Sequence, residues 1–192
     1  MKSHLRFVIR FTLAMVALFA LGDMIPRAAA ATMRWDTISQ TFPGGVPTLN
    51  TGGSDYALAA DLTTIQISGS GTFGGGVPPT GGGTWATSGP SGTASGTFTV
   101  IGVVRFTVAP GSLPPGVIDN IGPNARSGLA VFNIKYSDGS TGVLTVSCHL
   151  PVGSPSGIFE GVTATKGFVA FHERVPPVPG LDANRTAFHV LP

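Results

Sequence analysis

The chain has 192 residues, of which 42% are hydrophobic and only 10% are charged, with 11 Lys and Arg against 9 Asp and Glu. Binding of nucleic acid, or electrostatic binding to an anionic membrane surface, needs a strongly basic face that neutralises phosphates. Charges this few and this balanced provide no such face, so we expect neither kind of partner.

The first 30 residues have the pattern of a secretory signal peptide. A basic start is followed by an apolar run at residues 11–21, and alanines at 28–31 supply an A-x-A cleavage signal before Ala31 or Thr32. The basic residues of this start are Lys2, Arg6 and Arg10. The apolar run is too short for a stable transmembrane helix. We therefore predict a secreted or periplasmic protein of net charge −1, with no membrane span after cleavage.

Residues 31–192 are predicted to form a single all-β domain. A chain of this length can bury a sizeable core. Its Val, Ile, Leu and Phe residues occur in short bursts between Gly, Pro, Ser and Thr, which is typical of strands joined by turns. No segment of this part shows a helical period.

The first half contains two clear strand patterns. Residues 32–60 are polar and rich in turn formers, with Trp35 and Phe42 as expected anchors. Residues 63–73 alternate, and glycines on the inward side leave room for a neighbouring ring. After a flexible loop at 74–83, residues 93–108 give the longest strand pattern. The residues predicted to share its inner face are Phe98, Val100, Val104, Phe106 and Val108.

The second half begins with a hairpin. Residues 127–136 and 141–150 alternate on either side of Asp138-Gly139, the strongest short-range hairpin signal. Residues 158–171 predict one or two strands bent at Gly161 and Gly167. A proline-rich loop at 176–180 then precedes a closing strand at 186–191.

These patterns predict about eight strands, in a small antiparallel β-barrel or, alternatively, a two-sheet β-sandwich. Inward glycines favour the barrel, because closing a sheet requires bends. The interior would either pack solid or hold a small apolar ligand. The residues predicted to line it are Phe98, Phe106, Phe132 and Phe168.

The C-terminal part resembles a known family. Residues 156–162 read SGIFEGV and are followed by Gly167-Phe168-Val169 and a terminal aromatic strand. This segment resembles the end of the allene oxide cyclase barrels and of the related dirigent proteins. The resemblance implies an eight-stranded antiparallel barrel with a central cavity, and it carries no active-site residue over. The chain is also similar in texture to exported bacterial proteins of unknown function.

Cys148 and His149 are adjacent, but neighbouring residues on a strand point to opposite faces, so they cannot form a catalytic dyad. Cys148 shares its side with Leu144 and Val146, which predicts a buried, unreactive thiol. As the single cysteine it forms no intramolecular disulfide, and only an exposed thiol would allow a disulfide-linked dimer.

The histidines and glycine runs do not predict a metal or a cofactor. His149, His172 and His189 lack metal-binding spacings, although a barrel could bring them together at one rim with Glu160. The glycine runs at 69–76 and 81–83 lack the Lys and the following helix of a phosphate loop. We therefore predict neither a metal nor a cofactor.

Glu160 is the candidate catalytic residue, because it lies in an otherwise uncharged stretch. If it pointed into a cavity, its pKa would rise and it could act as a general acid or base. The alternative is a solvent-facing carboxylate, or a partner of Lys166 or Arg174.

Three functions are compatible with these observations. The first is a non-catalytic module that binds a small apolar ligand. The second is a cyclase or isomerase that uses Glu160, and the third is a structural module of the cell envelope. The sequence does not indicate the oligomeric state.

Overall fold

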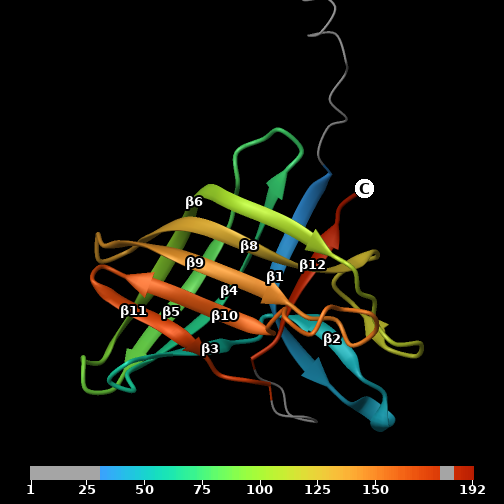
Figure 1. Cartoon of the computed structure of the whole chain (residues 1–192), viewed down its shortest axis with the longest axis horizontal. Helices are drawn as coiled ribbons and strands as arrows, with labels where there is room; N and C mark the ends of the chain where they lie inside the picture. The colour runs from blue at the N-terminus through green and yellow to red at the C-terminus, as the bar shows by residue number, and fades with distance from the viewer. Residues whose placement is uncertain (1–30, 178–183) are drawn as a thin grey trace, which may run out of the picture.

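The structure is a computed structural model that describes residues 31–177 and 184–192 (Figure 1). The predicted signal segment at 1–30 and part of the predicted proline-rich loop lie outside the described residues. In the first half the strands are β1 (Thr32–Thr41), β2 (Thr48–Thr51), β3 (Asp55–Ala59), β4 (Thr64–Gly74), β5 (Gly82–Ser88) and β6 (Ala94–Ala109), with a 3-10 turn at Pro43–Gly45. In the second half they are β7 (Ile118–Asp119), β8 (Ala125–Tyr136), β9 (Thr141–Cys148), β10 (Gly161–Lys166), β11 (Val169–Arg174) and β12 (Thr186–Val190).

Eight of these strands close into a ring. The order is β6-β5-β4-β3-β11-β10-β9-β8, every neighbouring pair is antiparallel, and β8 pairs back onto β6. The predicted all-β, barrel-like antiparallel architecture is thus confirmed. The predicted hairpin is also confirmed, since Lys135 pairs with Thr141 across a turn in which Gly139 has a φ of 88°.

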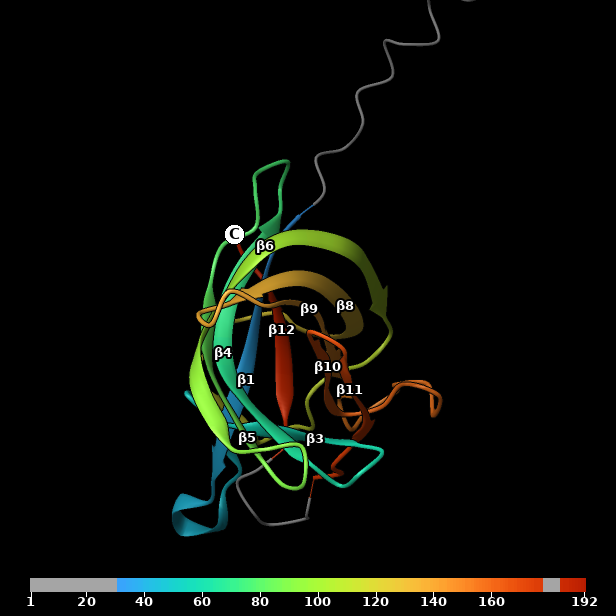
Figure 2. The ribbon, with the colours of Figure 1, turned by 90° about the vertical axis from the view of Figure 1, so that its left-hand side faces the viewer.

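The paired strands β1 and β12 make a second connection across the ring, between β4 and β8. β1 pairs with the C-terminal half of β4, and β12 pairs with the start of β8. Figure 2 shows β12 running between the β4 side and the β8–β11 side of the molecule. One face of the β1–β12 pair therefore points into the ring, and its opposite face points outward.

Aromatic side chains fill the interior of the ring. The Trp35 ring centroid lies 5.5 Å from that of Phe132, and Phe73 lies 5.2 Å from Phe132 and 4.8 Å from Phe106. The inward glycines of β4 make this packing possible, because a Cβ on Gly71 would lie 2.7 Å from the Trp35 indole nitrogen. The interior is therefore an aromatic core.

The structure corrects part of the predicted cavity lining. Phe98 and Phe132 are buried and Phe106 is partly buried, so these three lie inside as predicted. The prediction for Phe168 is wrong: its side chain is 100% exposed. It follows Gly167, which has a φ of 57°, in the tight turn between β10 and β11, where the chain leaves the wall of the ring.

The predicted inner face of the 93–108 strand is also corrected. Val104 is 58% exposed and Val108 is 52% exposed, although the alternation placed both with Phe98. The β6–β8 register shifts between Val100 and Gly102 and again between Val103 and Arg105. Each irregularity adds a residue to β6, and Val104 is the extra residue of the second one. Val108 lies beyond both shifts, one residue before the end of β6.

We predict that Phe132→Ala lowers the free energy of unfolding by about 3–5 kcal/mol, because it removes a buried ring from the aromatic core. Phe168→Ala is the matched control and should change stability by less than about 0.5 kcal/mol. Urea denaturation of the two variants measures both values. A loss for Phe168→Ala as large as that for Phe132→Ala would contradict the placement of these side chains.

Candidate functional site

The outward face of β1 and β12 carries a second, smaller apolar cluster. Ile38, Leu49 and Ala187 are buried there, away from the aromatic core. They are covered by residues 110–124, which we call the covering segment and which link β6 to β8. The covering segment contributes Leu113, Val117 and Ile121 to this cluster.

Several contacts attach the covering segment to the rest of the protein. Its β7 pairs in parallel with β2, and Ser112 forms an isolated bridge with Val152. Asp119 Oδ2 also lies 2.9 Å from Nε2 of His189, whose side chain is buried on β12. These contacts hold the segment over the outward face of β12.

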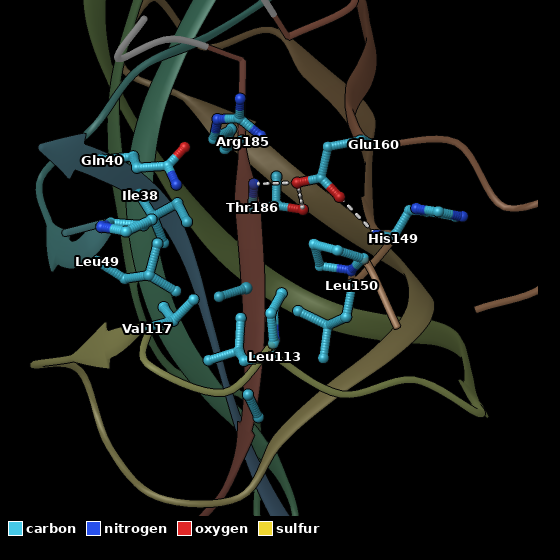
Figure 3. A pocket seen from close by; sticks show the side chains of 15 residues that line it. Ile38, Gln40, Leu49, Leu113, Val117, His149, Leu150, Glu160, Arg185 and Thr186 are labelled. Atoms are coloured by element: carbon cyan, nitrogen blue, oxygen red, sulfur yellow. Dashed lines mark hydrogen bonds between the residues drawn. The ribbon is translucent and has the colours of Figure 1, made fainter. Parts of the chain in front are cut away.

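A pocket of about 210 Å³ lies between β12 and the covering segment. Most of its wall is apolar. Leu49, Leu113, Val117 and Leu150 lie around its lower part in Figure 3, and Ile38 lies above them. The labelled polar residues gather toward the opposite end in the same view. They are Gln40, His149, Glu160, Arg185 and Thr186.

Glu160 stands at this polar end, just before β10, and its carboxyl group joins three strands. Oε1 accepts a hydrogen bond from the Thr186 backbone N–H at 2.6 Å, at the start of β12. Oε2 accepts one from the His149 backbone N–H at 2.5 Å, just after β9. The carboxyl group is therefore turned into the protein. The alternative of an ion pair with Lys166 is not what the structure shows, because the Lys166 ammonium pairs with Asp138.

Burial raises the pKa of Glu160 to about 8. The N–H donors of Thr186 and His149 lower this pKa, since they favour the ionised form, and the Arg185 guanidinium also lowers it. The negative charge of Asp55 acts in the opposite direction. Burial outweighs the donors, so the pKa of Glu160 lies above the ordinary value of a glutamate.

Asp55 is a buried acid that the sequence analysis did not single out. Its Oδ1 accepts a hydrogen bond from the Tyr56 N–H at 2.7 Å, and its Oδ2 has no hydrogen-bond partner among the described residues. Burial raises the pKa of this carboxyl to about 7. Gly161 makes room for it, because a Cβ at that position would lie 3.1 Å from Oδ2. Asp55, Ala57 and Ala59 are buried on the same face of β3. The sequence indicates this shared face only if residues 55–59 are known to form a strand.

The histidines do not gather around Glu160. The His149 ring points away from the pocket in Figure 3, and only its backbone N–H contacts the carboxyl group. His189 contacts Asp119, and His172 is exposed on β11. The described residues hold no group of three or more His, Cys, Asp or Glu that could bind a metal ion.

Cys148 is fully buried, as predicted, and burial raises the pKa of its thiol, which makes it a poor nucleophile. In the described part of the chain, no helix is long and apolar enough to cross a membrane.

Comparisons of this chain with protein-family models, curated proteins and solved structures found no match. The resemblance of residues 156–162 to the allene oxide cyclases therefore stays a prediction.

We predict that stability falls as the pH rises from about 4 to about 8. Because folding raises the pKa of Asp55 to about 7 and of Glu160 to about 8, the folded state binds more protons than the unfolded state in this window. The two carboxyl groups contribute their full stabilisation below about pH 4, where both are protonated in the folded and in the unfolded chain. This contribution is lost as the pH rises through their pKa values in the folded state.

Asp55→Asn should flatten this fall, because the amide keeps the acceptor for Tyr56 and cannot ionise. Urea denaturation at several pH values between 4 and 8 measures how the free energy of unfolding changes with pH. Asp138→Asn is the control and should leave the slope between pH 5 and 8 unchanged, since the pKa of Asp138 is lowered to about 2. An equal slope in wild type and Asp55→Asn would contradict the assignment.

Proposed function

We propose that this protein binds a small, mostly apolar ligand in the pocket between β12 and the covering segment. The observation that carries the proposal is the combination of an apolar wall with a few polar groups at one end, the usual composition of small-molecule sites. The polar groups orient a ligand, and the apolar wall provides the larger part of its binding free energy.

The volume of the pocket indicates the size of the ligand. A cavity of about 150 Å³ accommodates benzene, whereas sites for drug-sized molecules occupy about 300–1,000 Å³. At about 210 Å³, the pocket suits a molecule somewhat larger than benzene, such as a substituted six-membered ring or a short branched chain.

We propose that binding takes place outside the cytoplasm. The support is the N-terminal pattern of a basic start, an apolar run at 11–21 and alanines before Thr32. The mass of the denatured, exported protein tests this directly, since cleavage would leave a chain that begins at Ala31 or Thr32.

We predict that native mass spectrometry of the exported protein shows a discrete added mass that denaturation removes. The same measurement on Ala187→Leu should show the bare chain, because Ala187 is buried in the pocket wall and the larger side chain occupies the ligand's space. Ala170→Leu, the same change at an exposed position on β11, is the control and should keep the added mass.

Val117→Phe tests the same pocket from the covering segment, in case Ala187→Leu overpacks β12. Ala187→Leu and Val117→Phe should each lose the ligand and keep the circular dichroism spectrum of the wild type. An added mass that survives in folded variants of both kinds would place the ligand elsewhere. A bare wild-type chain that also binds no small hydrocarbon would contradict the proposal itself.

A second candidate function is proton transfer by Glu160, favoured by one observation: its carboxyl lines a mostly apolar pocket, where burial raises its pKa. In such an isomerisation, ionised Glu160 would take a proton from one ligand carbon and the resulting acid would return it to another. Incubation of the purified ligand in deuterated water tests this. Deuterium would enter ligand carbon with wild type and not with Glu160→Gln, whereas an unlabelled ligand would leave binding as the function.

A further inference from the structure

Four turns meet at one end of the ring, the end that faces the viewer in Figure 2. They join β3 to β4, β5 to β6, β8 to β9 and β10 to β11, at residues 60–63, 89–93, 137–140 and 167–168. A pocket of about 350 Å³ lies among them, which is within the range of about 300–1,000 Å³ for small-molecule sites. It shares no lining residue with the pocket beneath the covering segment.

Phe168 brings an aromatic ring to this end pocket. Its side chain lines the pocket and is fully exposed. The Gly167 N–H donates to the Thr141 carbonyl at 3.0 Å, which fixes the turn from which the ring projects. One exposed hydrophobic residue is common on protein surfaces and indicates nothing by itself. At the wall of a pocket, however, the negative face of the ring is available to the C–H groups of a ligand.

Hydroxyl groups form much of the remaining wall. They belong to Thr63, Thr87, Ser91, Thr93 and Ser140. The Ser91 hydroxyl donates to the Asp61 carboxylate. The Ser140 hydroxyl donates to the Asp138 carboxylate at 2.7 Å. A hydroxyl has one donor and two acceptor lone pairs, so both oxygens keep acceptor capacity after their protons are used. This wall therefore matches a ligand that itself carries O–H donors.

The walls of the end pocket are held in place by contacts within the protein. The Ser91 N–H donates to Thr63 Oγ1 at 2.8 Å, so the loop at 89–93 is attached to the neighbouring turn. The Lys166 ammonium pairs with Asp138, which attaches the end of β10 to the turn at 137–140. Walls that are already ordered reduce the entropy lost on binding.

The charges at this end favour an uncharged ligand. Lys166 is the charged residue in the pocket wall, and the Asp138 carboxylate neutralises its ammonium. An anion would have to compete with Asp138 for this ammonium. The ammonium has three N–H donors, so it also keeps donors for the oxygens of a neutral ligand. The end pocket thus offers an apolar ring face, hydroxyl acceptors and N–H donors without an uncompensated charge.

We propose that the end pocket binds a neutral saccharide, whose C–H face stacks on the Phe168 ring while its hydroxyl groups bond to Ser91 and Ser140. A pyranose ring combines these features, since one molecule carries an apolar C–H face and several hydroxyls that both donate and accept. The site is separate from the one in the proposed function, so either can exist without the other.

The test uses three neutral saccharides as probes: cellotriose, maltotriose and chitotriose. Dissociation constants are measured by protein-observed NMR for the wild type and for variants of Phe168. At least one saccharide should bind the wild type, and Phe168→Ala should weaken that binding by roughly 2- to 10-fold, as expected for one lost ring contact. Phe168→Trp should keep the binding, because the indole provides a larger face. Phe42→Ala, the same truncation at an exposed phenylalanine of the β1–β2 turn, is the control and should leave it unchanged.

Phe168 is fully exposed, so its variants should fold as the wild type does. Binding of none of the three saccharides would overturn the inference. Equal affinity of the wild type and Phe168→Ala would also overturn it, since the saccharide would then lie elsewhere. Capture of the wild type but not of Phe168→Ala by phosphatidylcholine vesicles would overturn it as well, because the ring would then be a membrane contact.

Discussion

The packing of Trp35 and Phe188 against the inside of the ring is the constraint on which the rest of this structure depends. Trp35 comes from β1 and Phe188 from β12, and both rings contact aromatic side chains of the surrounding strands. A closed sheet of eight strands has an interior that side chains can just fill. Here the two crossing strands complete that filling, so space for a ligand is found on their opposite face.

The same two strands consequently serve the core and the pocket at once. On β12, Phe188 faces the aromatic core, while its neighbour Ala187 belongs to the outward cluster. Glu160 fixes the start of β12 through the Thr186 N–H, and His189 joins the strand to the covering segment. The pocket thus has one rigid wall set by the core and a second wall set by the covering segment, which suits a preformed site.

The sequence predicted those features that depend on local patterns. The hairpin at Asp138-Gly139, the inward glycines of 63–73 and the closed antiparallel sheet all follow from alternation and turn chemistry. The pocket could not be predicted in this way, because alternation shows which residues share a face of a strand but not which segment covers that face. Asp55 was missed because its short strand is hidden in a turn-rich segment. Phe168 was misplaced because it lies in the turn between β10 and β11, where its side chain points into solvent.

The pocket lies outside the ring, between β12 and the covering segment. Diffraction from a crystal pressurised with xenon tests this location most directly, because xenon enters apolar cavities of this size without any specific chemistry. We expect xenon density among Ile38, Leu49 and Leu113, in the wall of the pocket. Xenon density among Phe73, Phe98 and Phe132, with none beneath the covering segment, would contradict it.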